Sequence, residues 1–258
     1  MSGPIRVSVD LTNPGQFFAC CGLFEIAERM GNGARAWFEP GLFFLNAPAV
    51  TTLGGLVACA VASTIEDLNP NDKYGTPLNL ALPRTQPLRL DWWSDRALKP
   101  WAGTMQGGRM ARAMKAACPA ALALGESLFE HGQVVLDPSE ADKKVEPFYF
   151  DSRRGANALA IDVGFSLDGI SLESLAYPAV EFFALVGLQR FRPQPVERRV
   201  FEYLPWAEPL PPLLASVAMN GAVPFQHLAV FRFENAFRTE QRKHKAFSPA
   251  IPSSRRTP

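Results

Sequence analysis

The stretch Asn13–Leu23, "NPGQFFACCGL", returns later in the chain as Pro178–Leu188, "PAVEFFALVGL". The identical positions are Phe17/Phe182, Phe18/Phe183, Ala19/Ala184, Gly22/Gly187 and Leu23/Leu188. Each copy places a proline ahead of an apolar run with helical spacing, a pattern that predicts a core helix. Two explanations stay open: an internal duplication, in which Gly22 and Gly187 mark equivalent close helix contacts, or two unrelated core helices.

The elements around the first copy follow the order β-α-β-β-α-β. They are a strand at Ile5–Asp10, a helix capped by Thr12 or Asn13 that runs to Met30 and is closed by Gly31 and Gly33, a hairpin of Arg35–Glu39 and Leu42–Asn46, a helix over about Thr51–Asp67 and a strand at Leu88–Trp93. This is the ferredoxin-like order.

The second half repeats this order more loosely. Its predicted elements are a strand near Ala160–Leu167, a helix at Pro178–Arg190, a strand at Val200–Leu204, a helix at Leu213–Met219 and a strand at Leu228–Glu234. We therefore predict an α+β fold with two ferredoxin-like halves joined by a helical insertion. The predicted divisions are 1–95, the N-terminal half; 96–150, a helical and acidic-loop insertion; 151–240, the second half; and 241–258, a basic flexible tail.

Composition sets limits but identifies no partner. The 258 residues are 47% hydrophobic and 20% charged, with a formal net charge of +1. The longest uncharged apolar run, Leu53–Ser63, is about half of the ~20 residues that a membrane span needs, so no span is expected. The four cysteines have no C-x-x-C spacing, which favours a cytoplasmic protein without a disulfide framework.

No catalytic constellation is recognisable. The chain has no phosphate-binding loop, nucleophile elbow, H-E-x-x-H or zinc spacing, and its three histidines are scattered. Asp151, Asp162 and Asp168 are candidate metal ligands, because hard cations bind carboxylate oxygens. A place in a turn or an ion pair with Arg153 or Arg154 explains these three residues better than a metal site. Cys20 and Cys21 fit as buried apolar residues. We expect no catalytic residue, no metal and no cofactor.

Basic residues are the strongest functional signal, and the first group lies in the insertion. Arg109, Arg112 and Lys115 are three residues apart, which places them along one side of a helix that follows Gly107 and Gly108. Helix starts of this kind receive phosphates. The alternative is an ordinary solvated helix face.

The second group lies in loops and at the C-terminal end. From Arg232 to Pro258 there are seven Lys and Arg against two carboxylates, and turn-rich segments carry further arginines. The candidates for phosphate contact there are Arg153, Arg154, Arg190, Arg192, Arg242, Lys243 and Lys245. A merely solubilising tail remains the alternative for the last three.

Four stretches, "DLTNPGQFFACCGLFEIAER", "LDWWSD" with "LKPWAGTMQ", "PFYFDSRRGANALAIDVGFSLD" and "YPAVEFFALVGLQRFRP", resemble the Csb-type subunits of type I-U (I-G) CRISPR interference complexes. These are similar to the large subunit of Cascade. The resemblance implies a non-catalytic, cytoplasmic protein of antiviral defence that works with crRNA, target DNA, the backbone and crRNA-end-binding Cascade subunits, and a helicase-nuclease.

The resemblance also directs attention to base reading beside the target, since large-subunit-like proteins contact a short adjacent motif. Amides and arginines on loops suit this role, so the candidates are Gln106 and Asn157 with Arg153 and Arg154, and Arg190 and Arg192 as outer phosphate contacts. Asn157 alternatively closes its own turn. Competing functions are a crRNA-binding or processing subunit with ferredoxin-like halves and a purely structural scaffold of the complex.

Overall fold

The computed structural model describes residues 3–69, 71–72, 76–102, 105–154, 175–238 and 244–253. Its helices are α1 (Pro14–Gly31), α2 (Leu53–Val61), α3 (Gly107–Ala117), α4 (Ala120–Ala123), α6 (Pro178–Gly187) and α7 (Pro212–Ala218), with 3₁₀ turns η1 (Trp92–Asp95) and η2 (Ser152–Arg154). Its strands are β1 (Ile5–Ser8), β2 (Arg35–Glu39), β3 (Leu42–Asn46), β4 (Thr64–Asp67), β5 (Leu78–Ala81), β6 (Leu88–Leu90), β7 (Leu136–Asp137), β8 (Glu140–Lys144), β9 (Gln194–Glu197), β10 (Val200–Tyr203), β11 (Val230–Phe237), β12 (Lys245–Phe247) and β13 (Ile251–Ser253). The fold is α+β, with several small antiparallel sheets.

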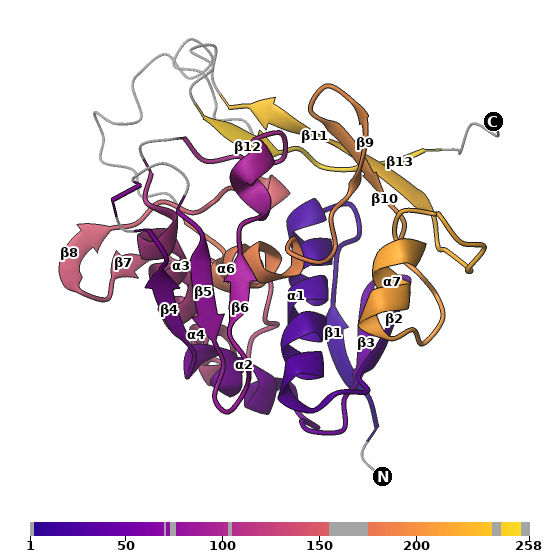
Figure 1. The fold of residues 1–258 in the computed structure, drawn as a ribbon, viewed down its shortest axis with the longest axis horizontal. Helices are drawn as coiled ribbons and strands as arrows, with labels where there is room; N and C mark the ends of the chain where they lie inside the picture. The colour runs from indigo at the N-terminus through magenta and orange to yellow at the C-terminus, as the bar shows by residue number, and fades with distance from the viewer. Residues whose placement is uncertain are drawn as a thin grey trace.

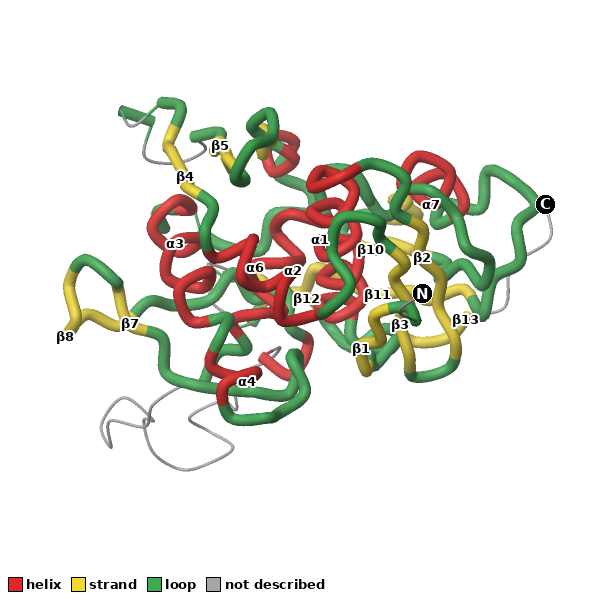
Figure 2. The backbone as a smooth tube through the Cα atoms, turned by 90° about the horizontal axis from the view of Figure 1, so that it is seen from below, coloured by secondary structure: helices red, strands yellow, loops and turns green. Residues whose placement is uncertain are grey.

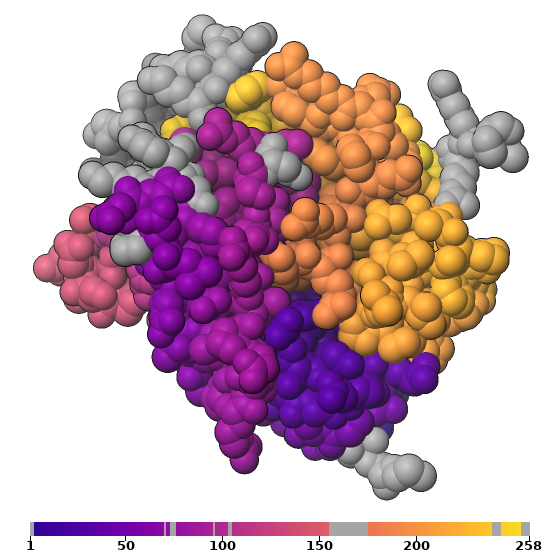
Figure 3. Space-filling model, in the orientation of Figure 1, coloured from indigo at the N-terminus to yellow at the C-terminus, as the bar shows by residue number. Residues whose placement is uncertain are grey.

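Helix α1, which contains most of the first copy, lies at the centre of the molecule (Figure 1). The side-chain oxygen of Asn13 accepts a hydrogen bond from Gly15 N at 3.1 Å, so the predicted cap is confirmed. Every residue from Pro14 to Ala27 is buried, and a helix that is apolar on all sides belongs in a core. From the side shown in Figure 3, later segments cover most of the indigo N-terminal part of the chain.

The two copies of the repeated stretch pack against each other. A Cβ atom added to Gly22 of α1 would lie 1.9 Å from the carbonyl oxygen of Phe183 in α6. A Cβ atom added to Gly187 would lie 2.1 Å from the carbonyl oxygen of Phe18. Only glycine permits this backbone approach, so the predicted close helix contacts are confirmed. The contacts are reciprocal, since each glycine meets the second phenylalanine of the other copy.

The N-terminal sheet has three of the four strands of the predicted ferredoxin-like half. Its order is β1-β3-β2, and the predicted hairpin forms β2 and β3. The expected fourth strand, β6, pairs with β5 in a separate β4-β5-β6 sheet. The side chain of Gln189 accepts hydrogen bonds from Asp91 N at 3.0 Å and Trp92 N at 3.2 Å, which ties the end of β6 to the segment after α6.

The second predicted helix is shorter than expected. Helix α2 ends at Val61, and Thr64–Asp67 form strand β4 instead of the last helical turn. The Ser63 hydroxyl donates a hydrogen bond to the carbonyl of Ala60 at 2.6 Å, and the β-branched Thr64 and Ile65 that follow favour a strand. Strand β5, for which we made no prediction, completes the pairing of β4.

The C-terminal strands correct the prediction of a flexible tail. Strands β12 and β13 both pair with β11, in a sheet of order β12-β11-β10-β9. Phe247 and Ala250 are buried, and their burial opposes disorder in the described part of this segment. In this sheet β10 pairs directly with β11. The predicted strand at Ala160–Leu167 lies outside the described residues.

The predicted insertion contains the helices α3 and α4 and a hairpin, β7–β8, where we expected an acidic loop. Figure 2 shows this hairpin at one end of the molecule, opposite the sheets that contain β3 and β13.

Buried residues from all four predicted segments lie in one hydrophobic core, which extends from Ile5 to Ala250 in sequence. Within the described residues, no helix combines the length and the apolarity that a membrane crossing requires.

Candidate nucleic-acid interface

Arg112 and Lys115, predicted to lie on one basic stripe, are bound to neighbouring parts of the protein. Arg112 Nη1 lies 3.0 Å from Asp67 Oδ2 in β4. Lys115 Nζ donates to the carbonyls of Ser63 and, at 3.1 Å, Val61, at the end of α2. Burial and the neighbouring charge of Arg112 lower the pKa of Lys115. These contacts hold α3 against α2 and β4, and they favour a structural role.

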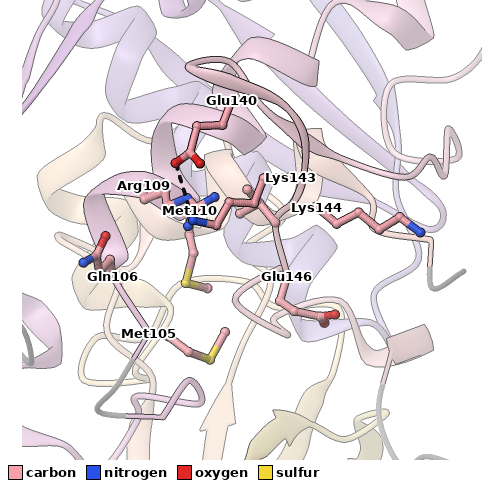
Figure 4. Close-up of a pocket in the computed structure, with 9 residues that line it drawn as sticks. Met105, Gln106, Arg109, Met110, Glu140, Lys143, Lys144 and Glu146 are labelled. Atoms are coloured by element: carbon pink, nitrogen blue, oxygen red, sulfur yellow. Dashed lines mark hydrogen bonds and ion pairs between the residues drawn. The ribbon is translucent and has the colours of Figure 1, made fainter. Parts of the chain in front are cut away.

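Gln106 and Arg109 instead line an opening between the start of α3 and the β7–β8 hairpin, which we call the hairpin groove (Figure 4). Its volume is about 440 Å³, and its other lining residues are Met105, Met110, Glu140, Lys143, Lys144, Val145 and Glu146. Figure 4 shows Gln106 and Lys144 at opposite ends of this group. The Gln106 side chain makes no capping hydrogen bond to α3, so its amide stays a candidate for base reading.

Charges in the hairpin groove are largely balanced. Arg109 Nε donates to Asp137, and the N–H of Ser139 and this guanidinium lower the pKa of the Asp137 carboxyl. Lys143 lies 3.4 Å from Glu140. Arg109 Nη2 is buried, and no group in the described part of the chain accepts a hydrogen bond from it. This groove suits a polar ligand of low net charge better than a polyanion.

A second group of cations, which we call the arginine cluster, consists of Arg153, Arg154, Arg199, Arg238 and Lys245. They come from η2, the turn between β9 and β10, the residue after β11 and the start of β12. Arg153 and Arg238 line one cavity of about 290 Å³. Lys245 pairs with Phe237 across β11 and β12, and the guanidinium of Arg199 lies 4.8 Å from the Phe237 ring centroid.

Two arginines of the cluster lie over tyrosine rings. The Arg153 guanidinium lies 3.4 Å from the ring centroid of Tyr177, and that of Arg238 lies 3.8 Å from the ring centroid of Tyr149. Tyr149 and Arg199 both have left-handed backbones, with φ of 69° and 65°. Such conformations cost free energy for residues other than glycine and gather at functional sites.

The cations are crowded enough to shift one another's titration. Burial and the charge of Arg199 lower the pKa of Lys245. Burial, Arg96 and Lys245 lower the pKa of Lys99 to about 8, although Asp72 acts in the opposite direction. Since like charges in a partly buried region repel, an anion placed among them relieves that repulsion.

Arg154 has an unused edge that other arginines of this chain use for carboxylates. The Nε and Nη2 atoms of Arg153 contact Asp151 at 3.0 and 2.7 Å, and those of Arg232 contact Glu202 at 2.9 and 2.7 Å. In Arg154 the same two atoms are buried, and within the described ranges no acceptor reaches them. In other arginines this edge is the fork that binds carboxylate or phosphate in a bidentate manner, but because both atoms are buried here, a ligand reaches the Arg154 edge only when the side chain moves.

A buried polar layer supports η2 beneath the cluster. Asn13 Nδ2 donates to Asp151 Oδ1 at 3.0 Å, and Asn13 Oδ1 accepts from Ser152 N at 3.1 Å. The Glu181 carboxyl accepts from Phe150 N and Asp151 N at 3.3 and 3.1 Å. Burial, reinforced by the charge of Asp151, raises the pKa of Glu181 to about 8. Sequence reasoning identified Asn13 as a helix cap but missed its partners, which lie more than 130 residues away.

The remaining predicted residues lie elsewhere. Arg190 binds the buried Glu25, with Nη2 3.2 Å from Oε1, which joins α1 to the segment after α6. Burial acts to raise the pKa of Glu25, but Arg190 and Arg29 outweigh it and lower the pKa. Arg192 is exposed. Asn157, Arg242 and Lys243 lie outside the described residues.

Among the groups that most often perform catalysis, two histidines make contacts within the protein and two thiols are fully buried. His131 Nδ1 lies 2.7 Å from Glu126, and His227 Nε2 lies 3.0 Å from the carbonyl of Ala218. Cys20 and Cys21 are fully buried, as predicted, and burial raises the pKa of both thiols. In the described ranges, no three His, Cys, Asp or Glu side chains gather as a metal site requires.

No protein-family model, curated protein or solved structure matches the chain.

Proposed function

We propose that this protein is a non-catalytic, nucleic-acid-binding subunit of a crRNA-guided type I surveillance complex. In this role it binds target DNA beside the protospacer, the crRNA backbone, or both, alongside the other Cascade subunits. The observation that carries the proposal is the arginine cluster. Its five cations come from η2, the β9–β10 turn and the β11–β12 region, and two of them, Arg153 and Arg238, line one cavity and lie over tyrosine rings.

The cluster suits a polyanion because it combines charge with geometry. Arginine forks recognise phosphate through two parallel hydrogen bonds, and guanidinium planes stack on nucleobases. Burial lowers the pKa of Lys99 and Lys245, and neighbouring cations lower both further, so several positive charges lie close together in this region. Phosphates of a bound strand complement such a group of cations and release counterions on binding.

The second candidate function is a crRNA-binding or processing subunit built on ferredoxin-like halves. The order β1-β3-β2 beside α1 favours it, because three strands of a ferredoxin-like sheet follow this order. The reciprocal contacts of Gly22 and Gly187 support a common plan for the two halves. The contacts of His131 and His227 and the burial of the Cys20 and Cys21 thiols favour binding over cleavage.

Salt-dependent binding tests the proposal. The purified protein, alone and with its operon partners, is titrated with crRNA, single-stranded DNA and duplex DNA at several salt concentrations. We expect the logarithm of the binding constant to fall linearly with the logarithm of the salt concentration. In the triple variant Arg154→Ala, Arg238→Ala, Lys245→Ala, we expect the slope for a single strand to be reduced by up to about 2 units, at ~0.7 per phosphate.

A matched triple variant, Arg6→Ala, Arg35→Ala, Arg89→Ala, removes three exposed cations elsewhere on the molecule. It is expected to leave the slope unchanged. If the wild-type protein binds no nucleic acid in any assembly, the scaffold function replaces the proposal. Cleavage of crRNA by the purified protein selects the processing function instead.

A further inference from the structure

The cavity of the arginine cluster has the size and lining of a pocket for one planar group. Its volume of about 290 Å³ lies near the lower end of the ~300–1,000 Å³ range of small-molecule pockets. The β11–β12 pair contributes Ala236, Phe237 and Ala246, and the serines Ser152 and Ser248 contribute hydroxyl groups. No acidic residue is among its described lining residues, in contrast to the hairpin groove.

Two arginines border this pocket, and both are positioned in advance. Arg153 is fixed by Asp151, by Glu130 at 2.7 Å and by the Tyr177 ring. Arg238 lies over the ring of Tyr149, whose backbone is left-handed. The carbonyl of Tyr149 accepts a hydrogen bond from Phe247 N at 3.0 Å, which joins this residue to β12. Guanidinium groups held in place over aromatic rings offer planes on which a nucleobase stacks at little entropic cost.

We propose that this pocket receives one unpaired nucleobase of a single-stranded nucleic acid, while Lys245 and the other cations of the arginine cluster attract the neighbouring phosphates. The inference rests on the proposed function and narrows it from nucleic acid in general to a single strand. A base within a duplex is stacked and paired, so it enters a pocket for one ring only after being extruded. The surrounding cations complement the phosphates on either side of the inserted base.

The test compares three probes of the same length: a single strand, a duplex and a single strand that lacks its bases but keeps its phosphates. RNA and DNA versions of the first probe identify the source of the strand. We expect the single strand to bind at least about fivefold more tightly than the abasic strand, the fold-change that corresponds to ~1 kcal/mol for stacking one base. Equal affinity for the normal and abasic strands would contradict the proposal that a nucleobase enters the pocket.

Filling the pocket without altering charge gives a second test. Ala236→Leu places a larger side chain on the pocket wall, and Ala58→Leu makes the same change on the exposed face of α2. We expect only Ala236→Leu to weaken single-strand binding, at least fivefold, with an unchanged salt slope and an unchanged affinity for the abasic strand.

Arg238→Lys keeps the positive charge but removes the planar guanidinium. It is the alternative test of the pocket if Ala236→Leu does not fold. We expect it to lose the preference for the normal strand over the abasic strand. Wild-type affinity in both pocket variants contradicts the inference but leaves the proposed function standing. Absence of any salt-dependent binding by the wild-type protein instead contradicts the proposed function.

Discussion

Two basic regions of this protein look alike in sequence but differ in how their charges are used. On α3, Arg109 and Arg112 bind carboxylates and Lys115 binds backbone carbonyls. In the arginine cluster, Arg153 and Arg199 also bind carboxylates, but cations crowd Lys245, and two buried nitrogens of Arg154 have no acceptor within the described residues. Positive charge that the fold already neutralises holds elements together, whereas a crowded group of cations is suited to an anionic ligand.

The largest expected effect distinguishes a buried from a surface ion pair. Arg153→Ala leaves the carboxylate of Asp151, which is 0% exposed, without its guanidinium partner, and we expect a loss of about 3–5 kcal/mol in the free energy of unfolding. Arg112→Ala breaks a pair whose side chains are 40% and 29% exposed, so about 0–1 kcal/mol is expected. Urea unfolding measures both, and equal losses would contradict the distinction.

The buried layer under the cluster predicts a dependence of stability on pH. Since the pKa of Glu181 is about 8 in the folded protein and its ordinary value is 4.5, the native state binds more protons between these values. This contribution to stability is fully present below pH 4.5 and declines, by up to ~1.4 kcal/mol per pH unit, until pH 8.

Glu181→Gln is expected to remove that decline, while Glu140→Gln on the exposed hairpin keeps it. Unfolding free energies at a series of pH values provide the comparison. A wild-type decline that persists in Glu181→Gln would show that another group causes it.

The smallest expected effect concerns α3. If Arg109, Arg112 and Lys115 each neutralised a phosphate of duplex DNA, replacing all three with alanine would reduce the salt slope by up to about 3 units, at ~0.9 per phosphate. Their contacts within the protein instead predict an almost unchanged slope together with a lower unfolding temperature. A reduced slope in this variant would transfer the binding surface from the cluster to α3.

Local patterns predicted the elements whose form depends on nearby residues. The cap at Asn13, the hairpin of β2 and β3 and the glycine contacts of α1 and α6 follow from capping, turn chemistry and helix packing, and all are present. The β7–β8 hairpin and the end strands β12 and β13 were missed, because polar or short segments become strands only when a partner strand is beside them.

The candidate site was predictable in composition but not in arrangement. Arg153, Arg154 and Lys245 carried a visible signal as basic residues in turn-rich segments. Arg199 and Arg238 belonged to the basic segments noted in the sequence but were not selected as site residues, and Tyr149 was missed, since their importance depends on contacts across the β11–β12 pair and η2. Which arginines find carboxylates is a tertiary property, and spacing along a helix cannot reveal it.

The central claim is that nucleic acid contacts the arginine cluster. Photochemical cross-linking of the protein to a single-stranded oligonucleotide, followed by peptide mass spectrometry, locates the contact directly, because aromatic side chains that stack near bases form adducts. The account predicts adducts on peptides that contain Tyr149, Tyr177 or Phe237, which border the cluster. Adducts confined to the hairpin groove, between Met105 and Met110 or between Glu140 and Glu146, would contradict it.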